Sequence, residues 1–235
     1  MESGHSLTDS LHKISSLNNY NSWIYESIKK GVSGRVLEIG CGIGNITDYL
    51  LKDGDKVCAA DIDADYVKFT AKKYKGRKNV KVIKLDINKP GKKIKSGAYD
   101  TAVMLNVLEH IKDEGRAVKN VKQALAKGGK FVILVPAMQI IYGEMDKALG
   151  HHKRYNKTEL KELLENNGFK ILDIFYLNFA GIIGWYFSGR ILKKSHIPEN
   201  QAKIFDKYIL PVTRPFERFL KPPAGQSIVA IAEKI

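Results

Sequence analysis

The hydrophobic positions of the chain alternate between short apolar runs and longer stretches whose apolar residues recur at helical spacing. The short runs predict strands over residues 34–39, 56–60, 80–85, 99–105 and 130–136. The helical spacing predicts helices over 45–52, 64–74 and 113–126, the last of them ended by Gly128 and Gly129. This alternation predicts an α/β fold with a doubly wound, mostly parallel sheet and helices on both faces.

The second half of the chain departs from this rhythm. After a connection rich in His, Tyr and Arg, we expect a helix over 157–167, a strand over 169–176 and a final strand over 227–231. The segment between these two strands, residues 177–226, is too long to be a bare loop in a compact domain. We therefore expect an α-rich insertion before the last strand.

The charge of the chain is strongly basic, with 39 Lys and Arg against 25 Asp and Glu and a formal net charge of +14. Residues 66–95 hold twelve basic residues and one acid, Asp86. Such a cluster attracts polyanions, either nucleic acid or an anionic membrane surface. The alternative interpretation is a solvated Lys-rich edge, which the scarcity of Arg and aromatic residues in this segment favours.

The two cysteines, Cys41 and Cys58, lack the spacing of a disulfide framework, and the polar N-terminus does not resemble a secretory leader. The most apolar stretch, residues 174–189, is shorter than the ~20 residues that span a bilayer. We therefore expect a cytoplasmic protein whose only membrane contact is peripheral.

The strongest chemical signal is a glycine-rich turn that follows the first strand. Glu38 precedes Gly40, Gly42 and Gly44, whose spacing is G-x-G-x-G rather than the G-x-G-x-x-G of a dinucleotide fingerprint. This motif, together with acidic or polar residues at the ends of the next three strands, resembles the class I S-adenosylmethionine-dependent methyltransferases. The resemblance covers residues 34–136.

The resemblance implies S-adenosyl-L-methionine as the cofactor and assigns a role to each strand end. Asp61 would bind the ribose hydroxyls, Asp86 the adenine amino group and Asn106 the methionine portion, while Ile62 and Ile87 would sandwich the base. Each residue also has a simpler interpretation. Asp61 is a candidate helix N-cap, Asp86 a turn residue, and the glycines a tight turn.

The resemblance also implies a seven-stranded sheet with an antiparallel last strand, and it divides the chain. We expect an N-terminal helical cap over 1–33, a cofactor-binding methyltransferase domain over 34–176 plus 226–235, and an insertion over 177–225. The insertion would face the acceptor or a membrane. A helix over 17–28 either closes over the cofactor or is anchored on the sheet by Trp23.

An oxygen acceptor needs a base, and His110 is the catalytic candidate because it follows the fourth strand and imidazole titrates near neutral pH. The alternative is a helix-start residue with a satisfied imidazole.

A second cluster, Gly150–Tyr155, resembles a Gly-His-x-x-Arg-Tyr stretch of a subgroup of bacterial and archaeal methyltransferases. It either lines the acceptor pocket with Tyr142 and Asp146 or is a self-bonded loop. Adjacent His151 and His152 do not predict a metal site.

The insertion carries aromatic residues between 175 and 187, followed by a series of basic residues, as in interfacial elements that touch anionic lipid. An ordinary subdomain with inward aromatic residues is the alternative.

We therefore expect methyl transfer to a small-molecule or lipid-linked acceptor, by O-methylation. The rivals are an RNA methyltransferase, a non-catalytic cofactor-binding scaffold and a nicotinamide dehydrogenase, with nucleic acid a weaker expectation than a peripheral contact with an anionic membrane.

Overall fold

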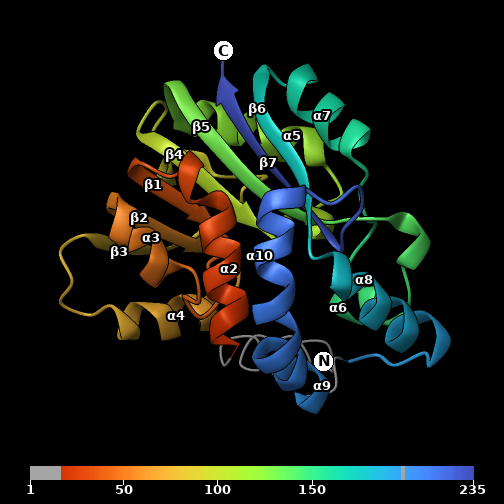
Figure 1. Ribbon diagram of the computed structural model, residues 1–235. Helices are drawn as coiled ribbons and strands as arrows, with labels where there is room; N and C mark the ends of the chain where they lie inside the picture. Colours follow the sequence, from red (N-terminus) through yellow and green to blue (C-terminus); the bar gives the residue numbers. More distant parts are fainter. Residues whose placement is uncertain (1–16, 197–198) are drawn as a thin grey trace.

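The architecture is one sheet with helices on both faces, seen in a computed structural model that describes residues 17–196 and 199–235 (Figure 1). Its strand order is β3-β2-β1-β4-β5-β7-β6. The strands are β1 (Gly34–Ile39), β2 (Gly54–Asp61), β3 (Val80–Lys84), β4 (Tyr99–Leu105), β5 (Leu125–Pro136), β6 (Phe169–Leu177) and β7 (Ser227–Lys234). All neighbours from β3 to β5 pair in parallel, whereas β7 is antiparallel to β5 and β6. The predicted seven-stranded fold class is confirmed.

Helices cover the sheet on two sides because consecutive strand residues face opposite cores. Val36 lies in the core with α2 and α3, while its neighbour Leu37 lies in the core with α5 and α7. The helices are α2 (Asn18–Ile28), α3 (Thr47–Asp53), α4 (Ala64–Lys73), α5 (Glu114–Ala124), α6 (Glu144–Leu149), α7 (Lys157–Asn166), α8 (Phe179–Trp185), α9 (Glu199–Ile204) and α10 (Leu210–Leu220).

Two predicted boundaries were wrong. Helix α5 ends at Ala124, and β5 begins at once with Leu125, which is buried and pairs with Tyr99. Gly128 and Gly129 therefore lie inside a long strand and do not end the helix; Gly128 has a φ of +71°. Helix α3 begins only at Thr47, because the glycine turn extends to residue 46.

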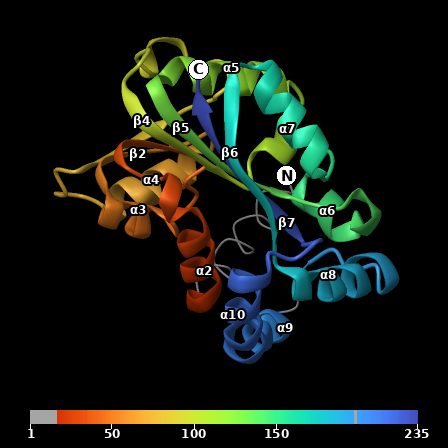
Figure 2. The same cartoon turned by 45° about the horizontal axis from the view of Figure 1, so that its top comes forward.

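The insertion between β6 and β7 is helical, as expected, and consists of α8, α9 and α10 joined by π-helical segments at Tyr186–Ile191 and Phe205–Ile209. Ser227 at the start of β7 pairs with Pro136 at the end of β5. The insertion is therefore attached at the same edge of the sheet as the carboxyl ends of the parallel strands. Figure 2 shows α8, α9 and α10 gathered at that end.

Helix α2 links the N-terminal part of the chain to the insertion. Trp23 is buried in the core against the sheet, so the anchoring interpretation of this residue holds. At the start of the helix, the backbone N–H of Tyr20 donates to Asp206 Oδ1 at 2.7 Å, and Asn19 Nδ2 donates to the Asp206 carbonyl at 2.9 Å. A carboxylate from the insertion thus caps α2. The predicted cap domain also includes residues 1–16, which lie outside the described residues.

The Lys-rich segment forms α4 and the edge strand β3. Lys81 and Lys84 lie on that edge, both exposed, where lysines prevent pairing with another sheet. This placement supports the interpretation as a solvated edge. Within residues 17–196 and 199–235, we find no helix with the length and hydropathy of a membrane span.

Candidate functional site

The glycine turn after β1 has a backbone that only glycine adopts easily. Gly40, Gly42 and Gly44 have φ values of +77°, +51° and +80°. A Cβ on Gly40 would lie 2.2 Å from the Val107 side chain, so the turn also packs against the segment after β4. The turn brings its backbone close to the ends of β1, β2 and β4, where a ligand of a parallel sheet binds.

Asp61 holds this turn in place. Its Oδ2 accepts from the Gly42 N–H at 2.8 Å and its Oδ1 from the Asp63 N–H at 2.9 Å. The N-cap of α4 is Asp63, whose side chain accepts from the N–H of Asp65 and Tyr66, so the simpler interpretation of Asp61 as a helix cap is wrong. Each Asp61 oxygen retains acceptor capacity for a ligand hydroxyl. Burial raises the pKa of this carboxyl, and hydrogen bonds to the charged form oppose that effect.

Glu38 lies behind the turn and not on its surface. The residue is buried, and its Oε2 accepts a hydrogen bond from Thr47 Oγ1 at 2.6 Å. Burial raises the pKa of Glu38 to about 8, against the lowering effect of the Thr47 hydrogen bond. The geometry therefore ties the end of β1 to the first turn of α3.

The predicted adenine-binding residues lie at the ends of β2 and β3, which are neighbours in the sheet. Asp86 Oδ1 accepts from the Asn88 N–H at 2.9 Å, so its turn interpretation holds and its second oxygen is available. Ile62 is 62% exposed, whereas Ile87 is 5% exposed and packs in the core. A base beside these residues would contact Ile62 far more than Ile87, and the sandwich stays a prediction.

Asn106 lies directly after β4 with a φ of +53°, and its N–H donates to the Leu134 carbonyl at 2.8 Å. Its side chain is exposed at the same edge as Gly40 and Asp61. These residues fit S-adenosylmethionine in their chemistry: carboxylates suit vicinal hydroxyls, an apolar side chain suits a base, and an amide suits an amino acid. Their roles toward the cofactor stay predictions.

His110 ends the short helix Leu108–His110 and is exposed. Desolvation, together with the nearby His151 imidazole, lowers the pKa of His110 to about 4, so the ring is neutral at neutral pH. The two rings meet edge to face with centroids 4.9 Å apart. The sequence pattern did not predict that His151 lies here, because α5, β5 and α6 separate the two histidines along the chain.

In the Gly150–Tyr155 cluster, Arg154 and Tyr155 are buried, whereas Gly150 and His152 are exposed. Arg154 is 2% exposed; its Nε donates to Asp146 Oδ1 at 2.8 Å and its Nη1 to the Ala137 carbonyl at 2.9 Å. Asp146 is 0% exposed and also accepts from Trp185 Nε1 at 3.0 Å. Burial raises the pKa of Asp146, but its hydrogen-bond donors and Arg154 together lower it. The interpretation as a self-bonded loop holds for Arg154. The sequence did not predict that Trp185, from the insertion, is a hydrogen-bond partner of Asp146.

Glu109 is a buried residue that the sequence pattern did not single out. It is 1% exposed, and neither side-chain oxygen has a hydrogen-bond partner among the described residues. Burial raises the pKa of Glu109 to about 8. A buried carboxyl without donors is costly, and native proteins rarely keep one without a use.

Known proteins resemble this chain in sequence. A family model described as a methyltransferase domain matches residues 7–174. A probable S-adenosylmethionine-dependent methyltransferase of Mycolicibacterium smegmatis is 28% identical over 156 residues, which cover 64% of this chain and 58% of that protein. A ubiquinone biosynthesis O-methyltransferase of Xanthomonas euvesicatoria pv. vesicatoria is 26% identical over 165 residues, 64% of this chain and 69% of that protein. The match to the first of these relatives thus spans less than two thirds of its length.

A solved structure agrees in fold. The S-adenosylmethionine dependent methyltransferase from Mesorhizobium loti superposes with a TM-score of 0.64 at 15% identity, covering 90% of this chain and 98% of that one. At this identity the likeness concerns the fold alone. Since the family model covers more than half of the sequence, the chain belongs to the methyltransferase-domain family, and its resemblance to the class I S-adenosylmethionine-dependent methyltransferases is confirmed.

Proposed function

We propose that this methyltransferase passes the methyl group of S-adenosylmethionine to an oxygen of a lipid-linked acceptor, which it meets at an anionic membrane surface. The observation that carries the proposal is the surface of the insertion. Its helices are attached at the edge of the sheet that holds the candidate cofactor residues, and they expose large apolar side chains next to basic ones.

The exposed apolar side chains of the insertion include residues of α10, of α8 and of the segment that follows α8. Phe216, Phe219 and Leu220 are 64%, 83% and 75% exposed, and Ile183 and Phe187 are 71% and 55% exposed. Thirteen of the eighteen exposed large hydrophobic residues found in the described part of the chain fall within residues 177–225. Of the aromatic residues between 175 and 187, Phe179, Tyr186 and Phe187 are exposed, so the inward-packed alternative fits only the others. Clustered exposure of this kind marks an interaction site.

The charge of the insertion suits an anionic lipid surface. Residues 177–225 contain eight Lys or Arg and three Asp or Glu. Basic residues near a membrane gain about 1 kcal/mol each from anionic headgroups, and adjacent aromatic and aliphatic side chains enter the boundary with the acyl region. The two features together favour a membrane surface over nucleic acid, because exposed aliphatic side chains contribute little to the binding of nucleic acid.

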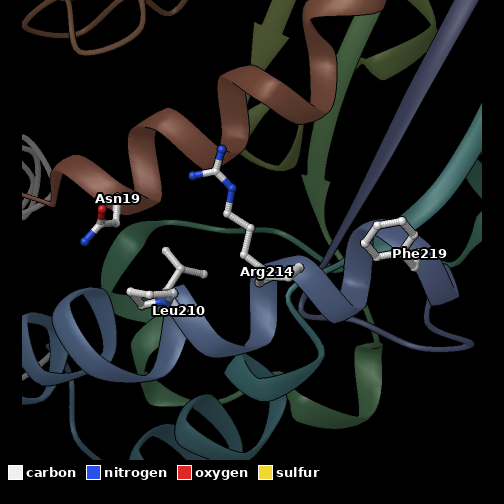
Figure 3. Close-up of a pocket in the computed structure, with 6 residues that line it drawn as sticks. Asn19, Leu210, Arg214 and Phe219 are labelled. Atoms are coloured by element: carbon white, nitrogen blue, oxygen red, sulfur yellow. The ribbon is translucent and has the colours of Figure 1, made fainter.

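A cleft of about 340 Å³ lies between α2 and α10 (Figure 3). Leu210, Pro211, Pro215 and Phe219 supply apolar walls, and Arg214 extends across the cleft toward α2. An apolar cleft with one cation suits a hydrocarbon chain that ends in an anionic group. A second cleft, of about 310 Å³, lies by the glycine turn and is lined by Asn45, Asp48 and Tyr49. Both clefts include residues from the start of α2, which lies between them.

Transfer to oxygen is supported by the name of one relative, the ubiquinone biosynthesis O-methyltransferase. The sulfonium methyl that S-adenosylmethionine supplies is already activated, so the protein chiefly positions the acceptor and excludes water. A hydroxyl acceptor loses a proton during transfer. His110, in the short helix that follows β4, is the candidate to receive it. Its imidazole is neutral at neutral pH and so has a free nitrogen, but its lowered pKa of about 4 makes it a weak base.

The test combines membrane binding with methyl transfer. Vesicles of phosphatidylcholine with and without phosphatidylglycerol are sedimented with the purified chain. Lipid and RNA extracts of bacterial membranes and cytosol are then incubated with the chain and S-adenosylmethionine labelled in the methyl group. We expect the chain to sediment with the anionic vesicles. We expect the label to enter the organic phase as a methyl ether or a methyl ester, which treatment with alkali or acid distinguishes.

The matched variants are Phe219→Ser in the insertion and Phe69→Ser on α4, where Phe69 is 47% exposed. The first should lose at least half of the vesicle-bound fraction, because it removes an exposed aromatic side chain from the proposed contact. The second should bind as the unmodified chain does. Label in RNA alone, or equal binding to both vesicle types by all three proteins, would refute the proposal.

A further inference from the structure

Three side chains from two separate segments form a cluster beside the end of β4. Glu109 and His110 lie in the short helix Leu108–His110, and His151 follows α6. One candidate ligand atom from each side chain lies within 4.8 Å of the other two. The two segments are held together by a hydrogen bond from the His152 N–H to the Glu109 carbonyl, at 2.8 Å. The cluster is therefore a feature of the folded chain, although its residues are distant in sequence.

The Glu109 carboxylate faces His151 without a hydrogen-bond donor of its own. His151 Nε2 lies 3.9 Å from Glu109 Oε1, beyond hydrogen-bond distance. Both Glu109 oxygens are buried and unpartnered among residues 17–196 and 199–235. Burial of a bare carboxylate is unfavourable, and a cation between it and the imidazole nitrogens would compensate both the charge and the missing contacts.

His151 is oriented as metal-binding histidines usually are. Its Nδ1 is 2.9 Å from Asp146 Oδ1, which fixes the ring and leaves Nε2 directed to the Glu109 side. Asp146 is fixed in turn by the Gly143 N–H at 3.0 Å and by Arg154. A carboxylate that holds the far nitrogen of an imidazole is the usual support of a histidine ligand, because it sets the tautomer and strengthens the donor.

We propose that Glu109, His110 and His151 bind a divalent transition-metal ion, with Asp146 as the positioning residue of His151. Two imidazoles and one carboxylate suit Zn²⁺ or another first-row divalent ion and not Mg²⁺, which prefers oxygen ligands alone. Bond lengths of about 2.0–2.2 Å place tetrahedral ligand atoms about 3.4 Å apart, so the cluster must contract by about 1 Å. His110 is the exposed member of the cluster, so its ring would supply most of that movement.

Three protein ligands leave one position open. An ion held there could take a hydroxyl oxygen of the acceptor at that position and would lower the pKa of the hydroxyl. This role rests on the proposed function, whereas the binding of the ion does not. A metal-bound His110 cannot accept a proton at the coordinating nitrogen. The ion would instead favour loss of the acceptor hydroxyl's proton to water.

The test is calorimetric titration of the purified, chelator-treated full chain with ZnCl₂, checked by competition with a fluorescent zinc indicator. We expect one site with micromolar or tighter affinity, and no heat from MgCl₂ at the same concentration. His110→Ala and Glu109→Gln should each weaken the binding of Zn²⁺ at least tenfold. Asp146→Asn should weaken it about ten- to a hundredfold with one site retained, as loss of an outer partner does.

The matched control is His152→Ala, because His152 is exposed, adjacent in sequence and outside the cluster. It should bind Zn²⁺ as the unmodified chain does. Circular dichroism of each variant confirms folding, and His110→Ala changes only an exposed residue. Absence of binding by the folded unmodified chain, or equal weakening by His152→Ala, would overturn the proposal. If the chain binds Zn²⁺ but transfers no methyl group, the metal site stands and the proposed acceptor is refuted.

Discussion

Asp146 is expected to be among the most costly residues of the chain to remove. It is 0% exposed, and its carboxylate accepts four hydrogen bonds, from Arg154, His151, Trp185 and the Gly143 N–H, at 2.8, 2.9, 3.0 and 3.0 Å. Asp146→Ala would remove all four and leave the 2% exposed Arg154 guanidinium buried without its counter-ion. Loss of one member of a buried ion pair costs about 3–5 kcal/mol, a third or more of the stability of a typical domain.

The measurement is the free energy of unfolding in urea, followed by far-UV circular dichroism, because the fluorescence of Trp185 would itself respond to the change. The matched control is Glu144→Ala in the same helix, whose ion pair with Lys147 is exposed on both sides. Its unfolding midpoint should stay within error of the unmodified chain.

A double variant separates the cost of breaking the ion pair from the cost of the lost side-chain volume. If Arg154 is replaced as well, in Asp146→Ala with Arg154→Met, no unpaired charge remains buried. The cost of the double variant should then be clearly less than the sum of the two single costs. A loss below about 1 kcal/mol for Asp146→Ala, or additive single costs, would refute the reasoning, because both imply that water replaces the lost contacts.

Three further changes test other parts of the site. Glu38→Gln should gain stability relative to the unmodified chain as pH rises from about 4.5 to about 8, since the raised pKa of this buried acid means that ionisation opposes folding; urea midpoints across that range measure it. Gly40→Ala should abolish calorimetric binding of S-adenosylmethionine, because its Cβ would meet Val107 at 2.2 Å at a φ of +77°. Asn156→Ala should cost about 1 kcal/mol in urea unfolding, because it removes the reciprocal capping box with Glu159.

The fold could be predicted in most of its elements because apolar runs and helical spacing are local signals. The bounds of β1 and β4 match their predicted ranges. Errors arose where local signals are ambiguous: Gly128 and Gly129 can end a helix or bend a strand, and pairing of Leu125 with Tyr99 decides between the two. An aspartate at a strand end is likewise ambiguous, and only the hydrogen bonds of Asp63 show which residue caps α4.

The candidate site could be predicted only where it follows the strand order. Gly40 and Asn106 each follow a parallel strand and Asp61 is the last residue of one. Parallel strands end at one edge, so the proximity of these residues follows from topology. Glu109 and His151 meet through loops on different elements, which no periodicity of the sequence records. The partner of Asp146 in the insertion, Trp185, is hidden for the same reason.

The buried polar cluster around Asp146 connects the insertion to the cluster of Glu109, His110 and His151. Trp185 at the end of α8 donates to Asp146, and Arg154 lies over its ring with 4.8 Å from the guanidinium carbon to the centroid. On the other side, Asp146 orients His151 toward Glu109. A shift of α8 on a membrane would therefore be transmitted to the imidazole through one carboxylate. Because every contact in that chain is buried or short, such a shift would change the position of His151 rather than be absorbed by mobile side chains.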